Sequence, residues 1–146
     1  MADLASVKNN VRKIISNEFG NVSEVDSGSF FIRNESTVAF VDIYDWEHDN
    51  QNVGRISVYA IVASGLKEIN KDLAVELVTD LSRAFGSWFF VKQDAGGYNL
   101  IFKTDLIAAT VDAPELINAI TIVAIVANEE DDKIVRKYGG TVFLTD

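Results

Sequence analysis

Hydrophobic and polar residues near the N-terminus repeat with the period of an α-helix. The apolar positions of this stretch are Leu4, Val7, Val11, Ile14, Ile15 and Phe19. Polar residues lie between them, so that one face of the stretch is apolar and the opposite face is polar. Gly20 follows the last apolar position, where a residue in the left-handed conformation commonly ends a helix. The pattern predicts an amphipathic helix over residues 3–19.

The next apolar stretches are shorter and rich in β-branched and aromatic residues, which is typical of strands. They cover residues 30–33, 37–46 and 53–63, separated by the turn-forming residues 34–36 and by the polar loop 47–52. Consecutive strands with short connections favour an antiparallel meander.

A second helical stripe and a hairpin follow the meander. Asn70 is placed to cap the helix, its apolar positions lie within residues 73–85, and Gly86 is placed to end it. Beyond Gly86, two aromatic-rich runs flank residues 94–97, Asp-Ala-Gly-Gly, which tolerate the positive φ of a tight turn. The sequence therefore predicts a β-hairpin over Trp88–Lys103.

The last helix has a clear start signal. In Asp112-Ala113-Pro114-Glu115 the aspartate can cap the first turn, the glutamate completes a capping box, and proline is tolerated there. The apolar run 116–127 holds so many β-branched residues that its periodicity fits a buried strand equally well. The cap, and helical spacing that continues to Tyr138, favour a helix. Because it is apolar nearly all round, we expect it to be the most buried helix.

Residues 141–144 are expected to add a terminal strand.

These elements predict an α+β fold in the order helix, three strands, helix, two strands, helix. The sheet should have about five antiparallel strands. A length of 146 residues and a hydrophobic fraction of 48% suit one domain, residues 1–146, with a substantial core.

Composition narrows the classes of partner. A net charge of −9 repels phosphate, so the sequence predicts no binding to nucleic acid. The N-terminus lacks a secretory signal, and the run 116–127 is too short to cross a bilayer, so no membrane association is expected. The chain has no cysteine, which fits a cytoplasmic protein.

Catalytic and metal-binding chemistry finds little support in the sequence. The densest set of potential metal ligands is Asp42, Asp45, Glu47, His48 and Asp49. The loop lacks the fixed ligand spacing and the central glycine of a calcium-binding loop. Polar hairpin loops of this kind are usually exposed to solvent without binding an ion. His48 is the one histidine, and neither glycine pair lies between a strand and a helix start, as a phosphate loop would require. We therefore expect no enzyme activity, no metal and no cofactor.

The acidic run Glu129–Asp132 lies beside the basic residues Lys133, Arg136 and Lys137. It could serve as a docking patch for a basic partner. A solvated helix face with local ion pairs is the more common outcome for such a run, and we favour it.

One face of the predicted sheet is too apolar for contact with water alone. In the third strand Ile56, Val58, Ala60 and Val62 are expected to point to the core, with Tyr98, Leu100 and Phe102 from the fifth strand and Phe89 and Val91 from the fourth. The opposite face then collects Phe40, Tyr44, Trp46, Tyr59, Ile61, Trp88, Phe90 and Ile101. A register with Ala39, Val41 and Ile43 on this face stays open for the second strand. Aromatic residues dominate the anchors of protein interfaces, so we expect a client segment, a second subunit or the first helix to cover this face.

The second half of the chain resembles a known family. Leu81-Ser82-Arg83-Ala84-Phe85-Gly86 before a hairpin, and Glu115-Leu116 opening a helix that ends in Tyr138-Gly139-Gly140, resemble the YbjN-like peptide-binding chaperones of bacteria. The element order is that of the type III secretion chaperone-like fold. Where such proteins commonly carry an asparagine in the second helix, this chain has Ser82 or no counterpart.

The resemblance implies a non-enzymatic module that binds a protein or peptide client. Such proteins are generally small, acidic, cytoplasmic and often homodimeric. Two alternatives remain open: a homodimeric regulatory or structural interaction protein, and a small-ligand or metal-binding protein that uses the acidic loop 42–49.

Overall fold

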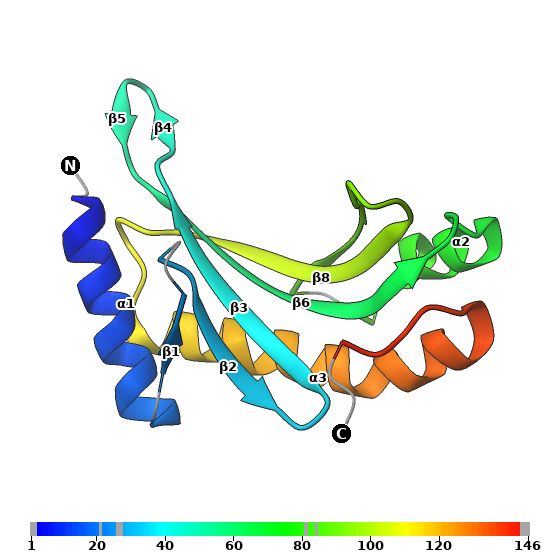
Figure 1. Ribbon diagram of the computed structural model, residues 1–146. Coiled ribbons are helices and arrows are strands. Elements are labelled where there is room, and N and C mark those ends of the chain that lie inside the picture. Colours follow the sequence, from blue (N-terminus) through cyan, green and yellow to red (C-terminus); the bar gives the residue numbers. More distant parts are fainter. Residues whose placement is uncertain (1–2, 21, 26–27, 81, 84, 144–146) are drawn as a thin grey trace.

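The structure is a twisted antiparallel sheet with α3 below it and with α1 and α2 at its opposite ends (Figure 1). It is a computed structural model that describes residues 3–20, 22–25, 28–80, 82–83 and 85–143. The elements are α1 (Leu4–Phe19), β1 (Ser23–Glu24), β2 (Phe30–Asn34), β3 (Thr37–Tyr44), β4 (Glu47–His48), β5 (Gln51–Asn52), β6 (Arg55–Leu66), α2 (Lys71–Thr79), β7 (Ser87–Lys92), β8 (Tyr98–Ile107) and α3 (Ala113–Tyr138).

The main sheet has six strands in the order β1-β2-β3-β6-β8-β7, and every neighbouring pair is antiparallel. This confirms the predicted α+β class and the meander, to which the two-residue strand β1 is added. The polar loop 47–52 forms a separate two-stranded ribbon, β4–β5, that projects from the end of the β3–β6 hairpin (Figure 1).

Capping side chains fix the starts of the helices where the sequence predicts them. The Asp3 carboxylate accepts hydrogen bonds from the N–H groups of Ala5 and Ser6, both at 3.3 Å. Asn70 caps α2 through the N–H of Leu73 at 3.1 Å, and Asp112 caps α3 through the N–H of Glu115 at 2.8 Å. Each bond satisfies a backbone donor that the first helical turn leaves free.

The helix α3 forms over the β-branched run and is the most buried helix of the described chain. Its buried residues are Leu116, Ala119, Ile120, Val123, Ala124, Val126, Ala127, Asp131 and Ile134. It packs along β6, β3 and β8 and also contacts α1. The strand alternative is therefore wrong here. None of the described helices is both long enough and apolar enough to span a bilayer.

The second helix ends earlier than predicted. It stops at Thr79, because the Asp80 carboxylate accepts a hydrogen bond from the N–H of Ser82 at 2.9 Å and so closes a turn. Leu81 and Ala84 lie outside the described residues. Gly86 does not cap the helix. A Cβ there would collide with the Phe102 ring, so this glycine makes room for that ring.

The third strand of the meander is longer at its far end than predicted. β6 continues to Leu66 past Ser64 and Gly65, which mark its expected end, because register shifts toward β8 absorb these residues and Gly65 has a φ of 67°. Of the expected terminal strand 141–144, Thr141 forms an isolated antiparallel bridge with Ser64, and Leu144 lies outside the described residues.

Candidate functional site

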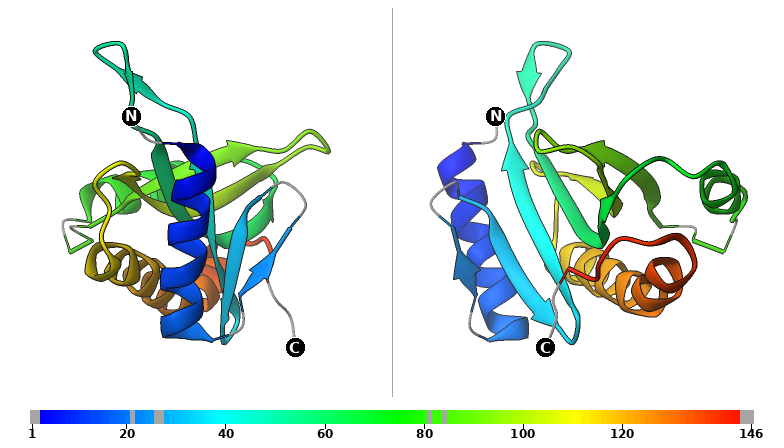
Figure 2. Two further views of the ribbon diagram at one scale, coloured as in Figure 1. Left: turned by 90° about the vertical axis from the view of Figure 1, so that its left-hand side faces the viewer. Right: turned by 45° about the vertical axis from the view of Figure 1, so that its right-hand side comes forward.

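The face of the sheet that points away from α3 is the candidate site. On the opposite face, Val41, Val58 and Phe102 have no exposed surface and belong to the core between the sheet and α3. The buried residues of α1, Val7, Val11 and Ile15, belong to this same core. Figures 1 and 2 accordingly show the helices below or beside the sheet, and no described helix crosses its other face. The alternative in which α1 covers the aromatic face is therefore wrong.

The strand pairing decides the register that the sequence left open. Ala39, Val41 and Ile43 are buried, with at most 9% exposure, so the alternative register for β3 is excluded. Phe40 lies directly opposite Tyr59, and Tyr44 opposite Arg55. Directly paired residues share a face, so the open face holds these four residues. Ile61 pairs with Ile101 and lies on the same face, as expected.

Two of the expected face residues point the other way. Trp88 pairs with Phe102 and Phe90 pairs with Leu100, so both pack against the core. Phe89 and Val91, expected in the core, lie on the open face and are 43% and 40% exposed. The prediction failed because it took Lys92 as a marker of the wetter face. β7 is the last strand of the sheet, and a long lysine side chain at such an edge can reach water from either face.

Trp46 lies beyond the end of β3, at the base of the β4–β5 ribbon. Its indole is 43% exposed and stacks on the imidazole of His48, with ring centroids 5.8 Å apart. It is accessible but does not line the groove described next.

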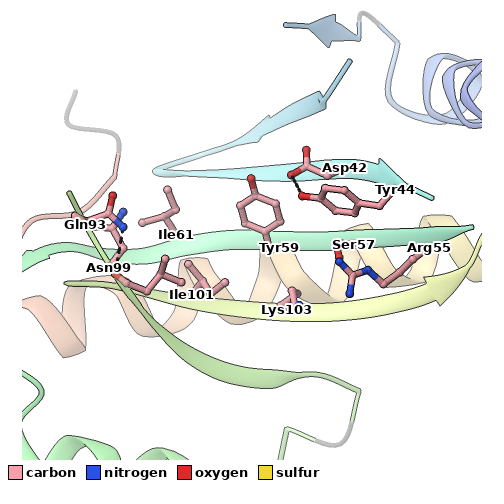
Figure 3. A pocket seen from close by; sticks show the side chains of 11 residues that line it. Asp42, Tyr44, Arg55, Ser57, Tyr59, Ile61, Gln93, Asn99, Ile101 and Lys103 are labelled. Carbon is pink, nitrogen blue, oxygen red and sulfur yellow. Dashed lines mark hydrogen bonds between the residues drawn. The ribbon is translucent and has the colours of Figure 1, made fainter. Parts of the chain in front are cut away.

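Side chains of the open face line a shallow groove of about 380 Å³ (Figure 3). The lining residues are Asp42, Tyr44, Arg55, Ser57, Tyr59, Ile61, Val91, Gln93, Asn99, Ile101 and Lys103. They come from β3, β6, β7, β8 and the start of the β7–β8 turn, and they divide into a charged end and an apolar end.

At the charged end the Tyr44 side chain links an acid to a base. Its hydroxyl donates a hydrogen bond to Asp42 at 3.0 Å, and the Arg55 guanidinium lies 5.0 Å from the centroid of its ring. Among the described residues, no group accepts a hydrogen bond from the buried Nε of Arg55.

The groove environment raises the pKa of both its tyrosines. Burial raises the pKa of Tyr59 well above the ordinary value, and the negative charge of Asp42 adds to the effect. Burial, followed by the hydrogen bond to Asp42, also raises the pKa of Tyr44. Both phenols therefore remain protonated near neutral pH and can act as hydrogen-bond donors.

The wall formed by β8 carries a second set of polar contacts. The Ser57 hydroxyl donates to Asp105, whose carboxylate also lies 3.4 Å from the Lys103 ammonium. Lys103 in turn lies 4.9 Å from the centroid of the Phe89 ring. Because the ammonium has an acid and an aromatic ring beside it, this wall is partly neutralised.

At the apolar end, Ile61, Ile101 and Val91 form the floor, with two amide side chains at the margin. The Asn99 amide oxygen accepts hydrogen bonds from the Ser64 hydroxyl at 3.2 Å and from the Gly65 N–H at 3.3 Å. The Gln93 amide donates to the Val91 carbonyl at 3.1 Å. The groove is thus apolar at one end and hydrogen-bonding at the other, a combination suited to a peptide segment.

The acidic loop does not assemble a metal site in the described part of the chain, where no three His, Asp or Glu side chains converge. His48 instead stacks on Trp46 and lies 3.5 Å from the Asp49 carboxylate. Tyr44 holds Asp42 separately, on the open face.

Intramolecular contacts also use most of the acidic run of α3. Arg83 pairs with Glu129 at 3.1 Å and with Glu130 at 2.7 Å, and the Ser36 hydroxyl donates to the buried Asp131 at 2.6 Å. The expected solvated face with local ion pairs is therefore only partly present. Lys133 lies 3.5 Å from Glu130 one helical turn away, but Asp131 is buried and Glu129 and Glu130 pair with Arg83 from another segment.

An antiparallel sheet with one helix-covered face and one grooved, partly aromatic face defines a class of binding module. The chain belongs to the family described as T3SS (YopN, CesT) and YbjN peptide-binding chaperone 1, whose model matches residues 5–146. No curated protein matches the chain in sequence.

Solved structures share its fold at low sequence identity. The ExsC–ExsE complex contains a chain with a TM-score of 0.61 and 11% identity, over 90% of this chain and 96% of that one. The HopA1–SchA chaperone–effector complex gives 0.57 and 11%, over 90% and 99%. The Yersinia pestis type III secretion chaperone SycH, in complex with a fragment of YscM2, gives 0.53 and 10%, over 84% and 98%. These likenesses establish the type III secretion chaperone-like fold that the element order predicts.

Proposed function

We propose that this protein is a non-enzymatic chaperone that binds an extended segment of a client protein in the groove of the open sheet face. The observation that carries the proposal is the groove itself. It combines an apolar floor of Ile61 and Ile101 with tyrosine and arginine donors at its other end, on a face that no described helix covers.

The chemistry of the groove fits a peptide. Isoleucine and valine side chains would accept apolar client residues, and the Tyr59 hydroxyl and the Arg55 guanidinium supply hydrogen-bond donors for client carbonyl oxygens. Membership of a peptide-binding chaperone family, and neighbours that were solved as chaperone–effector complexes, support a protein client. The proposal places the protein in the cytoplasm, as a homodimer.

The test is selection of binding peptides against a matched pair of variants. Random peptides are panned on the wild-type protein, and the dissociation constants of the enriched sequences are measured for wild type, Ile101→Glu and Ile125→Glu. Ile101 lies in the groove, whereas Ile125 is 47% exposed on α3, on the other side of the sheet.

We expect Ile101→Glu to weaken binding at least about tenfold, because a charge would replace the apolar floor, and Ile125→Glu to leave it unchanged. Melting temperatures verify that both variants fold. Equal weakening by both variants, or no effect of either, would overturn the assignment of the groove.

A further inference from the structure

The main sheet is split at one end, and a short segment from the C-terminal part of the chain fills the split. β3 pairs with β6 only as far as the Ala39–Ala60 pair, although β6 continues to Leu66. Beyond this point Ser64 pairs instead with Thr141. The N–H of each residue donates to the carbonyl of the other, and both distances are 2.8 Å.

Two glycines bring the chain from the end of α3 to this position. Gly139 and Gly140 have φ values of 92° and 82°, a region that side chains strongly disfavour. A Cβ on Gly140 would also lie 2.7 Å from the Ser64 carbonyl oxygen. The close approach of the two backbones therefore depends on glycine.

Two residues after the bridge, an aromatic ring reaches the open face. The Phe143 ring meets the Phe40 ring edge-on, with centroids 5.7 Å apart and an interplanar angle of 76°. Phe40 stacks on Tyr59 at 5.1 Å, and Tyr59 lines the groove. Residues 141–143 thus contact the same face as the groove, directly beside it.

We propose that Ser64, Phe40 and Tyr59 form a strand-accepting site, the β6 slot, which binds a client segment of defined pattern. The client pairs antiparallel with Ser64 and places an aromatic side chain on Phe40 two residues after the paired residue. Residues 141–143 occupy the slot in cis and show this pattern. The inference rests on the proposed function, because the client is the peptide that the groove holds.

Residues 141–143 are held weakly enough to be displaced. In the described structure a two-bond bridge and a ring contact attach them, whereas ladders of many residue pairs join β6 to β8 and β7 to β8. A client that continues from the slot into the groove gains contacts with Ile61 and Ile101, whereas residues 141–143 are not among the residues that line the groove. It can therefore replace them.

The experiment uses the chain's own segment as the probe. A fluorescein-labelled synthetic peptide of residues 139–146, Gly-Gly-Thr-Val-Phe-Leu-Thr-Asp, is titrated with the full chain and with the full-chain variant Thr141→Pro/Phe143→Ala. Proline removes the N–H that donates to Ser64, and alanine removes the ring, so the variant should vacate the slot. We expect it to bind the probe at least about tenfold more tightly than wild type, because occupied slots lower the apparent affinity.

A peptide with alanine in place of its phenylalanine is the matched control and should bind the variant at least about tenfold more weakly. Equal affinity of wild type and variant for the probe, or equal binding of the two peptides, would overturn the slot. Should the double variant fail to fold, Phe143→Ala alone is compared with wild type in the same titration.

The two proposals fail in different ways. If panned peptides respond to Ile101→Glu but the probe binds wild type and double variant equally, the groove stands and the slot is refuted. If the probe binds the double variant as expected and no panned peptide depends on Ile101, the slot stands and the groove is refuted.

Discussion

At the scale of single residues, Asp42 sets the electrostatics of the groove. Its carboxylate accepts the Tyr44 hydroxyl at 3.0 Å and lies close enough to Tyr59 to raise the pKa of that phenol, after the larger effect of burial. In the sequence Asp42 stands out only as one of a set of potential metal ligands. Its coupling to two tyrosines on neighbouring positions becomes visible only through the pairing of β3 with β6.

Replacing Asp42 by asparagine should lower the pKa values of Tyr44 and Tyr59 toward the ordinary tyrosine value. The reason is that the substitution removes a negative charge that opposes formation of the phenolate. Ultraviolet absorbance of tyrosinate during an alkaline titration measures the effect, and Asp94→Asn in the β7–β8 turn is the control. Unchanged titration in the Asp42 variant would contradict the assigned coupling.

The raised pKa values of Tyr44 and Tyr59 predict that the protein becomes less stable at high pH. Both folded-state pKa values lie above the unfolded value, so the contribution is complete below about pH 10 and is lost as the pH rises through the folded values. The loss of stability at high pH should therefore be shallower in Asp42→Asn than in wild type.

At the scale of elements, local signals in the sequence predicted where helices begin better than where they end. Asn70 and Asp112 each cap the helix they were expected to cap, because capping depends on residues three or fewer positions away. The end of α2 was predicted at Gly86, but the turn closed by Asp80 ends it first. A glycine that makes room for a distant ring, as Gly86 does for Phe102, looks in the sequence like a helix stop.

The α3 cap gives a quantitative prediction. Asp112→Ala should lower the free energy of unfolding by about 1 kcal/mol, because the Glu115 N–H loses its acceptor at 2.8 Å. Chemical denaturation measures the change, with Asp94→Ala in the β7–β8 turn as a control for removing an acid elsewhere. A variant as stable as wild type would show that α3 derives nothing from this cap, only from its packing.

At the scale of the whole molecule, the sequence predicted the fold class and element order but only part of the open face. Phe40, Tyr44, Tyr59, Ile61 and Ile101 lie on it as expected, since alternation within central strands fixes their direction. The orientation of Trp88 and Phe90 failed at an edge strand, where the alternation of polar residues carries less information. The contact of Phe143 with Phe40 joins residues far apart in the chain, so no local sequence pattern predicts it.

Assembly is the remaining prediction at this scale. The described surface leaves large apolar side chains exposed, among them Val78 at 78% and Phe85 at 72%. A net charge of −9 disfavours random association, so self-association requires a defined apolar patch. We expect light scattering at micromolar concentration to give twice the 16.1 kDa mass of the chain, and higher salt to preserve it. A mass of one chain at every concentration would contradict the dimer.

The β4–β5 ribbon has a practical consequence for work on this protein. Its turn residues Asp49 and Asn50 have φ values of 52° and 61°, their side chains are exposed, and in the described structure its two strands pair only with each other. Extra residues placed there lengthen a loop without entering the core, and each doubling of loop length costs only about 0.6 kcal/mol. The ribbon is thus a natural attachment point for an affinity tag or a surface-coupling linker, leaving the groove and the β6 slot unmodified.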